Sequence, residues 1–164
     1  MPEVFLDRIF SGDNQAKERR RFFIERGGMD RLPLGKLNIE TLISWCAKQS
    51  DVSVWPIVGA NINLWKTKAE DKSVSLSEDA MNFLVAAPDA HSVLNAFASR
   101  LESRSGGGAE AMKARVEALR KLTKSANADI AKAAEVVVTE ADKHVGALGH
   151  MEQRRDEGCE QTFE

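Results

Sequence analysis

Residues 116–134 read VEALRKLTKSANADIAKAA, and this stretch decides the predicted fold. Val116, Leu119 and Leu122 follow the three-and-four spacing that places apolar side chains on one face of a helix. A polar break at 125–127 interrupts the pattern, and Ile130 and Ala134 then resume it. The stretch therefore predicts two helices joined by a short turn.

The second of these helices is expected to be long, running from about Ala128 to about Glu157. Its apolar positions step alternately by four and three residues: Ile130, Ala134, Val137, Ala141, His144, Leu148 and Met151. This heptad-like seam is typical of a long helix that lies on a neighbouring helix. A homodimer formed through this helix stays open as an alternative. The acidic residues 158–164 are expected to fray.

Upstream, the serine- and glycine-rich residues 103–108 (SRSGGG) predict a flexible joint. We therefore expect helical pairs over 1–102, the joint at 103–108, a final helical hairpin over 109–157 packed on the same domain, and a tail at 158–164.

Caps and breakers divide residues 1–102 into further predicted helices. Two short helices are expected at 5–10 and 14–26, followed by a loop with Pro33 and Gly35. Asn38 is expected to cap the next helix, which carries Ile39, Leu42, Ile43 and Cys46.

Three more helices are expected before the joint. Asp51 or Ser53 opens one that has Pro56 in its first turn and Trp55, Val58, Ile62 and Trp65 on one side. Ser75 and Glu78 have the spacing of a capping box for a helix with Met81, Leu84 and Val85. Asp89 is expected to cap its partner, which has Val93, Leu94, Phe97 and Leu101 at core spacing.

These helices form four pairs of about 35–45 residues, a period found in helical solenoids. Residues 116–134 resemble a HEAT repeat in having leucines at the end of one helix, a short polar turn, and an aliphatic residue followed by alanine. Residues 84–94 match the same pattern less closely. The resemblance implies an all-α fold of stacked antiparallel pairs that binds macromolecules along one face. It also implies a C-terminal region of a larger bacterial protein.

Length and composition agree with one globular domain. The chain has 164 residues, 43% of them hydrophobic, and a formal net charge of −2, so the whole molecule is not built as a polyanion binder. The N-terminus lacks a secretory apolar region, and no stretch is apolar enough to span a bilayer. Cys46 and Cys159 do not form a disulfide framework pattern. We expect a cytoplasmic protein without a membrane partner.

No motif points to catalysis, a metal or a cofactor. The sequence contains neither H-E-x-x-H nor paired C-x-x-C nor G-x-S-x-G, and Gly106–Gly108 lack the lysine of a phosphate-binding loop. His91, His144 and His150 have no ligand spacing, with His144 expected on the heptad-like seam. We expect no enzyme. An enzyme would need carboxylates that only tertiary folding brings together.

Two basic stretches and one tryptophan are the candidate binding residues. Arg19 and Arg20, with Arg21, Lys17 and Arg26, are predicted to form one basic ridge, and Lys113, Arg115, Arg120, Lys121 and Lys124 a second. The alternative interpretation is a solvated helix face paired with Glu18, Glu25, Glu110 and Glu117. Of Trp45, Trp55 and Trp65, two fall at positions expected to face the core, and core packing is the alternative to a binding role for all three. If one is exposed as an interface anchor, we expect it to be Trp65.

The sequence thus predicts a non-catalytic binding or scaffolding module whose partner is a protein. The alternative is a helical repeat that binds the phosphate backbone of nucleic acid through its basic ridges. Arg19, Arg20 and Trp65 are the predicted binding residues.

Overall fold

The structure, a computed structural model, describes residues 4, 6–7, 33–67, 73–101 and 108–160. These ranges hold six α-helices, two 3₁₀ turns and one two-stranded antiparallel sheet. The described part is therefore mostly helical, in agreement with the predicted class, but it contains a small sheet that the sequence did not lead us to expect.

The elements follow one another along the chain in a simple order. They are η2 (Pro33–Lys36), α3 (Ile39–Lys48), α4 (Val54–Gly59), β1 (Trp65–Thr67), β2 (Val74–Leu76), α5 (Glu78–Ala86), α6 (Ala90–Ala98), α7 (Gly108–Arg120), η3 (Lys121–Lys124) and α8 (Ala128–Glu160).

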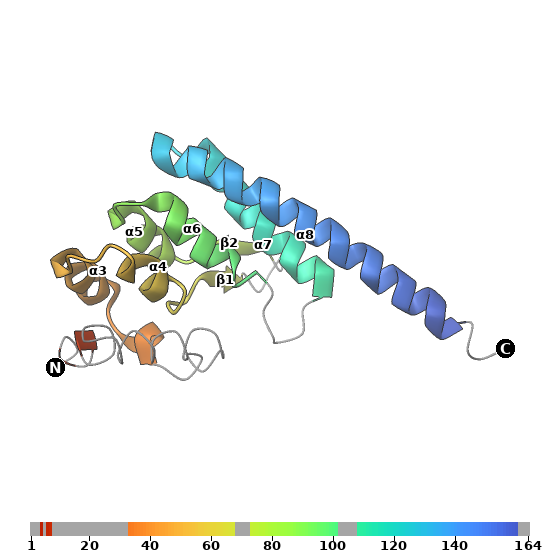
Figure 1. Cartoon of the computed structure of the whole chain (residues 1–164), viewed down its shortest axis with the longest axis horizontal. Coiled ribbons are helices and arrows are strands. Elements are labelled where there is room, and N and C mark those ends of the chain that lie inside the picture. Colours follow the sequence, from red (N-terminus) through yellow and green to blue (C-terminus); the bar gives the residue numbers. More distant parts are fainter. Residues whose placement is uncertain (1–3, 5, 8–32, 68–72, 102–107, 161–164) are drawn as a thin grey trace.

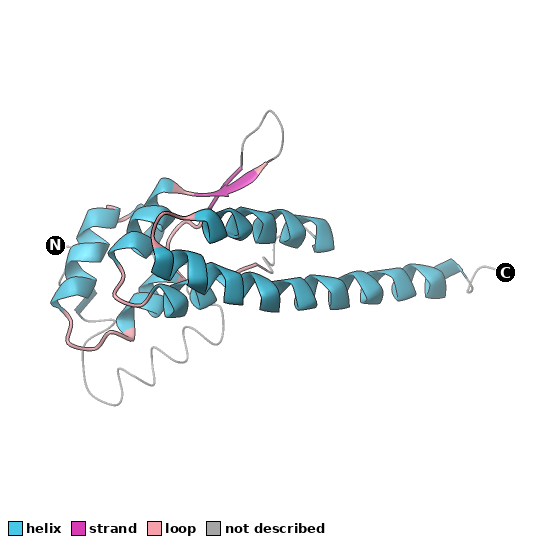
Figure 2. Ribbon diagram, turned by 90° about the horizontal axis from the view of Figure 1, so that it is seen from above, coloured by secondary structure: helices cyan, strands magenta, loops and turns pink. Residues whose placement is uncertain are grey.

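Helices α3 to α6 form one cluster, and α7 and α8 lie beside it as an antiparallel pair (Figure 1). Helix α6 contacts both α4 and α8, so it joins the two groups of helices. Helix α8 is much longer than α7, and its C-terminal part extends beyond the rest of the described chain (Figures 1 and 2).

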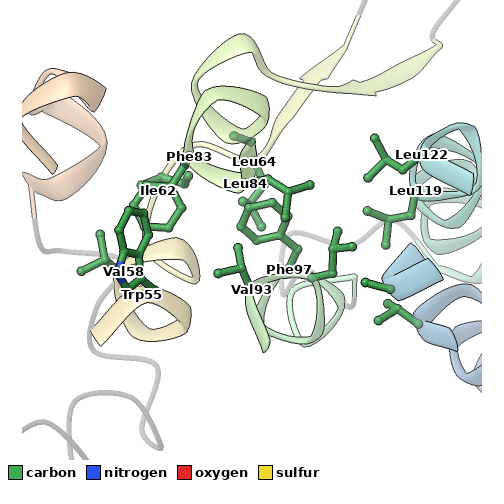
Figure 3. Close-up of a cluster of buried hydrophobic side chains, with 14 of the residues drawn as sticks. Trp55, Val58, Ile62, Leu64, Phe83, Leu84, Val93, Phe97, Leu119 and Leu122 are labelled. Atoms are coloured by element: carbon green, nitrogen blue, oxygen red, sulfur yellow. The ribbon is translucent and has the colours of Figure 1, made fainter. Parts of the chain in front are cut away.

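A single apolar core connects these helices. Trp55 and Phe83 face each other with ring centroids 5.1 Å apart and planes tilted by 51°. From there the buried side chains continue through Phe97 of α6 to Leu119 and Leu122 beside α8 (Figure 3). Burying each of these large side chains contributes about 1.5–3 kcal/mol, so this continuous core is the main source of stability.

Polar side chains fix where several helices begin. Asn38 and Asp89 are the N-caps of α3 and α6, as predicted: the Asn38 side chain accepts a hydrogen bond from the Glu40 N–H, and the Asp89 side chain accepts from the N–H groups of His91 and Ser92. Pro56 lies in the first turn of α4, also as predicted.

The predicted capping box of α5 is wrong. Ser75 lies in β2, and the N-cap is Ser77, whose hydroxyl oxygen accepts from the Ala80 N–H at 3.1 Å. The predicted core face is only partly right, because Leu84 is buried whereas Val85 is 61% exposed. Phe83, which the prediction omitted, is fully buried.

The predicted helix from Asp51 or Ser53 to Trp65 is too long. Helix α4 ends at Gly59, and Trp65 begins strand β1. After the helix, Ile62 and Leu64 are buried while Asn63 between them is exposed, which is the alternation of extended chain. Trp65, Lys66 and Thr67 then pair with Leu76, Ser75 and Val74, respectively.

The heptad-like seam of α8 is confirmed over its first half. Ile130, Ala134, Val137 and Ala141 are all buried. Beyond Ala141, His144 is exposed and the neighbouring Val145 packs partly against the core in its place, whereas Leu148 packs partly against the core as predicted. The predicted position of His144 on the seam is therefore wrong. The helix ends at Glu160, close to the predicted end near Glu157.

The predicted helix at 14–26 and the joint at 103–108, apart from Gly108, lie outside the described residues. Of the first predicted helix, Leu6 and Asp7 are described, and both are helical. Leu6 is fully buried in the core, and the Trp45 indole Nε1–H donates to Asp7 Oδ1 at 2.8 Å. Pro33–Lys36, predicted as a loop, forms the 3₁₀ turn η2.

Candidate binding groove

An open groove lies where the end of α7 and the turn η3 face α8. Its volume is about 530 Å³. The lining residues are Glu117, Arg120, Lys121, Thr123, Lys124, Glu135, Val138 and Thr139. Five of these eight side chains are charged, so the groove is a polar surface feature rather than an apolar pocket.

Local capping explains the sharp turn that creates the groove. The Thr123 hydroxyl donates to the Arg120 carbonyl at 2.9 Å, and the Ser125 N–H donates to the Leu122 carbonyl at 2.9 Å. Asn127 Oδ1 accepts from the N–H groups of Asp129 and Ile130 at the start of α8. Buried Leu122 and Ile130 anchor the two sides of the turn in the core.

Arg120 is held in place by two carboxylates. Its Nη2 donates to Asp142 Oδ1 at 2.8 Å and to Oδ2 at 2.9 Å, and its Nε donates to Glu117 Oε1 at 3.1 Å. The hydrogen bonds to Asp142, followed by the bond to Glu117, raise the pKa of the Arg120 guanidinium. Arg120 thus links α7 to α8, and its charge is balanced within the protein.

The remaining charged side chains of the groove are exposed. Lys121 and Lys124 project from η3 and are exposed, and neither forms an ion pair with another described residue. Glu135 is an exposed acid on the α8 side. Between them, Val138 is only 3% exposed, and the Thr139 hydroxyl donates to the Glu135 carbonyl at 2.8 Å. The groove thus offers both signs of charge.

The groove gathers only part of the second predicted basic ridge. Arg120, Lys121 and Lys124 line it, whereas Lys113 is exposed elsewhere on α7. Arg115 is half-buried, and its Nη1 donates to the Leu101 carbonyl at 2.6 Å. The ridge is therefore not one continuous cationic surface. Of the predicted ion pairs, the one between Glu117 and Arg120 is confirmed.

Of the predicted binding residues, Trp65 is not among those that line this groove. Arg19 and Arg20 lie outside the described residues. Trp65 is half-buried in β1, and its indole Nε1 is buried without a hydrogen-bond partner. Trp45 and Trp55 are buried, as predicted.

Sequence reasoning missed the α8 side of the groove. Asp142 accepts a hydrogen bond from Arg120 although it lies 22 positions later in the sequence, and no local motif predicts that pairing. A weak signal was present, because Glu135, Val138, Thr139 and Asp142 follow helical spacing and so share one face of α8.

Across the described ranges, no group of three or more His, Cys, Asp or Glu side chains is placed to hold a metal ion. His91 is exposed, with its ring 3.3 Å from Asn95 Nδ2, and His144 is also exposed. Burial raises the pKa of the Cys46 thiol to about 12, so it is protonated at neutral pH.

Two further observations concern membrane-spanning helices and similarity to known proteins. None of the helices in the described ranges combines the length and the apolar character needed to cross a membrane. Comparison of the chain with protein-family models, with curated proteins and with solved structures found no match.

Proposed function

We propose that this chain is a non-catalytic binding module and that its groove between η3 and α8 takes a protein partner. The observation that carries the proposal is the charge of the groove, where exposed Lys121 and Lys124 lie across from exposed Glu135. A protein segment with side chains of both signs complements such a surface. Arg120, paired with Asp142 and Glu117, contributes to the groove a side chain whose charge is already balanced within the protein.

The same charges argue against nucleic acid as the partner. A phosphate backbone is uniformly negative, and its affinity comes from cations that neutralise successive phosphates. Here Glu117 and Glu135 line the groove beside the two free lysines, and the charge of Arg120 is already balanced. Nucleic-acid binding through the predicted ridges is therefore the second candidate.

We further propose that the helices stack as HEAT-like pairs. The contacts that support this arrangement are those within the α5–α6 and α7–α8 pairs and the contact of α6 with α8 in the next pair. The β1–β2 hairpin interrupts the series between α4 and α5. A stack of this kind binds through an extended rigid surface, which agrees with an open groove better than with an enclosed site.

The test is affinity capture with the full chain and with two charge-matched variants. Lys121→Glu/Lys124→Glu reverses the free cations of the groove. Lys113→Glu/Lys132→Glu makes the same change in net charge at exposed positions outside the groove lining. Half of each captured sample is treated with nuclease before mass spectrometry.

We expect a defined protein that survives nuclease and is retained by the wild type and by the Lys113/Lys132 variant, but lost from the groove variant. Its binding should depend only moderately on salt. Captured material that disappears on nuclease treatment, with a steep loss of affinity at higher salt, would favour the nucleic-acid candidate instead.

A further inference from the structure

The hairpin of β1 and β2 leaves one strand edge open. Residues opposite each other in this antiparallel pair are Trp65 and Leu76, Lys66 and Ser75, and Thr67 and Val74. One step before, the Ser77 N–H donates to the Leu64 carbonyl at 2.8 Å. Because hydrogen-bonded and non-hydrogen-bonded pairs alternate, Leu64 and Lys66 direct their backbone groups toward β2. Trp65 and Thr67 direct theirs away from it.

These outward groups are not satisfied within the described residues. No backbone or side-chain hydrogen bond there involves the outward N–H and C=O of Trp65 or Thr67, and β2 is the strand that packs closely on α7. Figure 2 shows the hairpin standing out from the helices, and Lys66 and Thr67 are exposed. Trp65 also has a buried indole N–H without an acceptor, a rare feature in folded proteins.

We propose that the open edge of β1 binds an extended segment of a protein partner by antiparallel β-strand addition. Backbone N–H and C=O groups of the segment would pair with those of Trp65 and Thr67. Main-chain hydrogen bonds supply affinity in this mode of recognition, and the side chains beside them supply specificity.

Lys66 determines which side chain the partner segment carries opposite it. The partner residue opposite Lys66 occupies a non-hydrogen-bonded pair, where side chains approach most closely. An opposite charge stabilises such a pair and a like charge destabilises it. The segment therefore carries Asp or Glu at that position. A second copy of this chain fits poorly, because a symmetric pairing that uses all three residues of β1 would place Lys66 opposite Lys66.

The inference rests on the proposed function only in taking a protein as the partner. The edge belongs to β1, whereas the groove is lined by residues of α7, η3 and α8. Separate variants therefore test the two surfaces.

The experiment titrates the full ¹⁵N-labelled chain with two synthetic peptides, Thr-Val-Glu-Val-Thr and Thr-Val-Lys-Val-Thr, followed by NMR. We expect the amide signals of Trp65 and Thr67 to move most, and the glutamate peptide to bind about threefold or more tightly than the lysine peptide. Lys66→Glu should reverse that preference. Equal affinities of the wild type for the two peptides would overturn the proposal, and so would shifts confined to other residues.

Two substitutions at position 67 isolate the backbone bond. Thr67→Pro removes an N–H that points away from β2, so the hairpin keeps its own hydrogen bonds while peptide binding is lost. Thr67→Val keeps the N–H and should bind as the wild type does. If Thr67→Pro disturbs the fold, the reversed peptide preference of Lys66→Glu still tests whether the peptide binds beside β1.

The groove variant Lys121→Glu/Lys124→Glu separates this inference from the proposed function. It should bind the glutamate peptide with unchanged affinity. If it loses the peptide while Thr67→Pro retains it, the peptide occupies the groove, and strand addition is wrong although the groove proposal stands.

Discussion

The backbone of Gly59 in α4 passes so close to the ring of Phe97 in α6 that a β-carbon at position 59 would lie 3.2 Å from Phe97 Cε1. The same β-carbon would lie 3.2 Å from Cε1 of Phe83 in α5. Both rings are fully buried, so each would have to shift by a few tenths of an ångström within the core to make room for it. The absence of a side chain at Gly59 is therefore what lets α4 approach both helices.

Gly59→Ala should destabilise the protein by about 1–3 kcal/mol, because it forces an extra methyl group into a filled core. The ordinary preference of a helix for alanine over glycine, about 0.5–1 kcal/mol, acts in the opposite direction and is too small to compensate. Chemical denaturation followed by circular dichroism measures the change. An unchanged or increased free energy of unfolding would show that the two rings can move aside.

Gly146→Ala and Gly149→Ala are matched controls with the opposite expected sign. Both glycines lie in α8, and a β-carbon at either would meet nothing within 4 Å. Each substitution should stabilise α8 by about 0.5–1 kcal/mol and increase its helical content. Amide exchange over 141–150 provides a local measurement. Faster exchange in either variant would contradict this expectation.

The helices were predictable because periodicity and caps agree. Asn38 and Asp89 mark the starts of α3 and α6, and the apolar spacing from Met112 to Leu122 marks α7. The strands were not predictable, because three residues are too few to show a period. Trp65 also lies three residues after Ile62, a helical spacing that suggested a longer α4. Tertiary pairing with Leu76 decided otherwise.

The departure of the α8 seam from the prediction is confined to one step. His144 is exposed and Val145, the next residue, packs partly against the core, whereas Leu148 keeps its predicted position there. Spacing alone does not choose between positions 144 and 145, because both lie near the edges of the buried face of a straight helix with 3.6 residues per turn.

Only one side of the groove could be predicted from the sequence. Its lysines stand out in the sequence, whereas the pairing of Arg120 with Asp142 depends on how α7 packs on α8.

Asp89 should make the stability of the protein depend on acid pH. Hydrogen bonds from Ser92, first through its hydroxyl and then through its N–H, hold the pKa of Asp89 below its usual range. Because the folded value is the lower one, this contribution is present above the unfolded pKa of about 3.9 and is lost as the pH falls through the folded value. Asp89→Ala, which removes the cap, should cost about 1 kcal/mol at pH 7.

Other carboxylates titrate over the same range, so the informative quantity is the difference in unfolding free energy between the wild type and Asp89→Asn. This variant keeps an acceptor oxygen but cannot ionise. The difference should be constant from about pH 5 upward and should shrink toward pH 2. A difference that stays the same at both ends of this range would mean that the charge of Asp89 does not contribute.

Cys46 should report on opening of the core. Its side chain is fully buried in α3, and burial raises the thiol pKa to about 12, so both access and ionisation oppose reaction. In a Cys159→Ser background, a maleimide should label Cys46 about 10³-fold or more slowly in native buffer than in guanidinium chloride.

The labelling rate of Cys46 should also follow stability. When that rate is limited by the fraction of molecules whose core is open, Gly59→Ala should accelerate labelling about tenfold for every 1.4 kcal/mol of stability lost. An acceleration that matches the measured destabilisation would mean that α3 and α4 open together with the whole core. Fast labelling of the unmodified core would instead show that α3 opens independently.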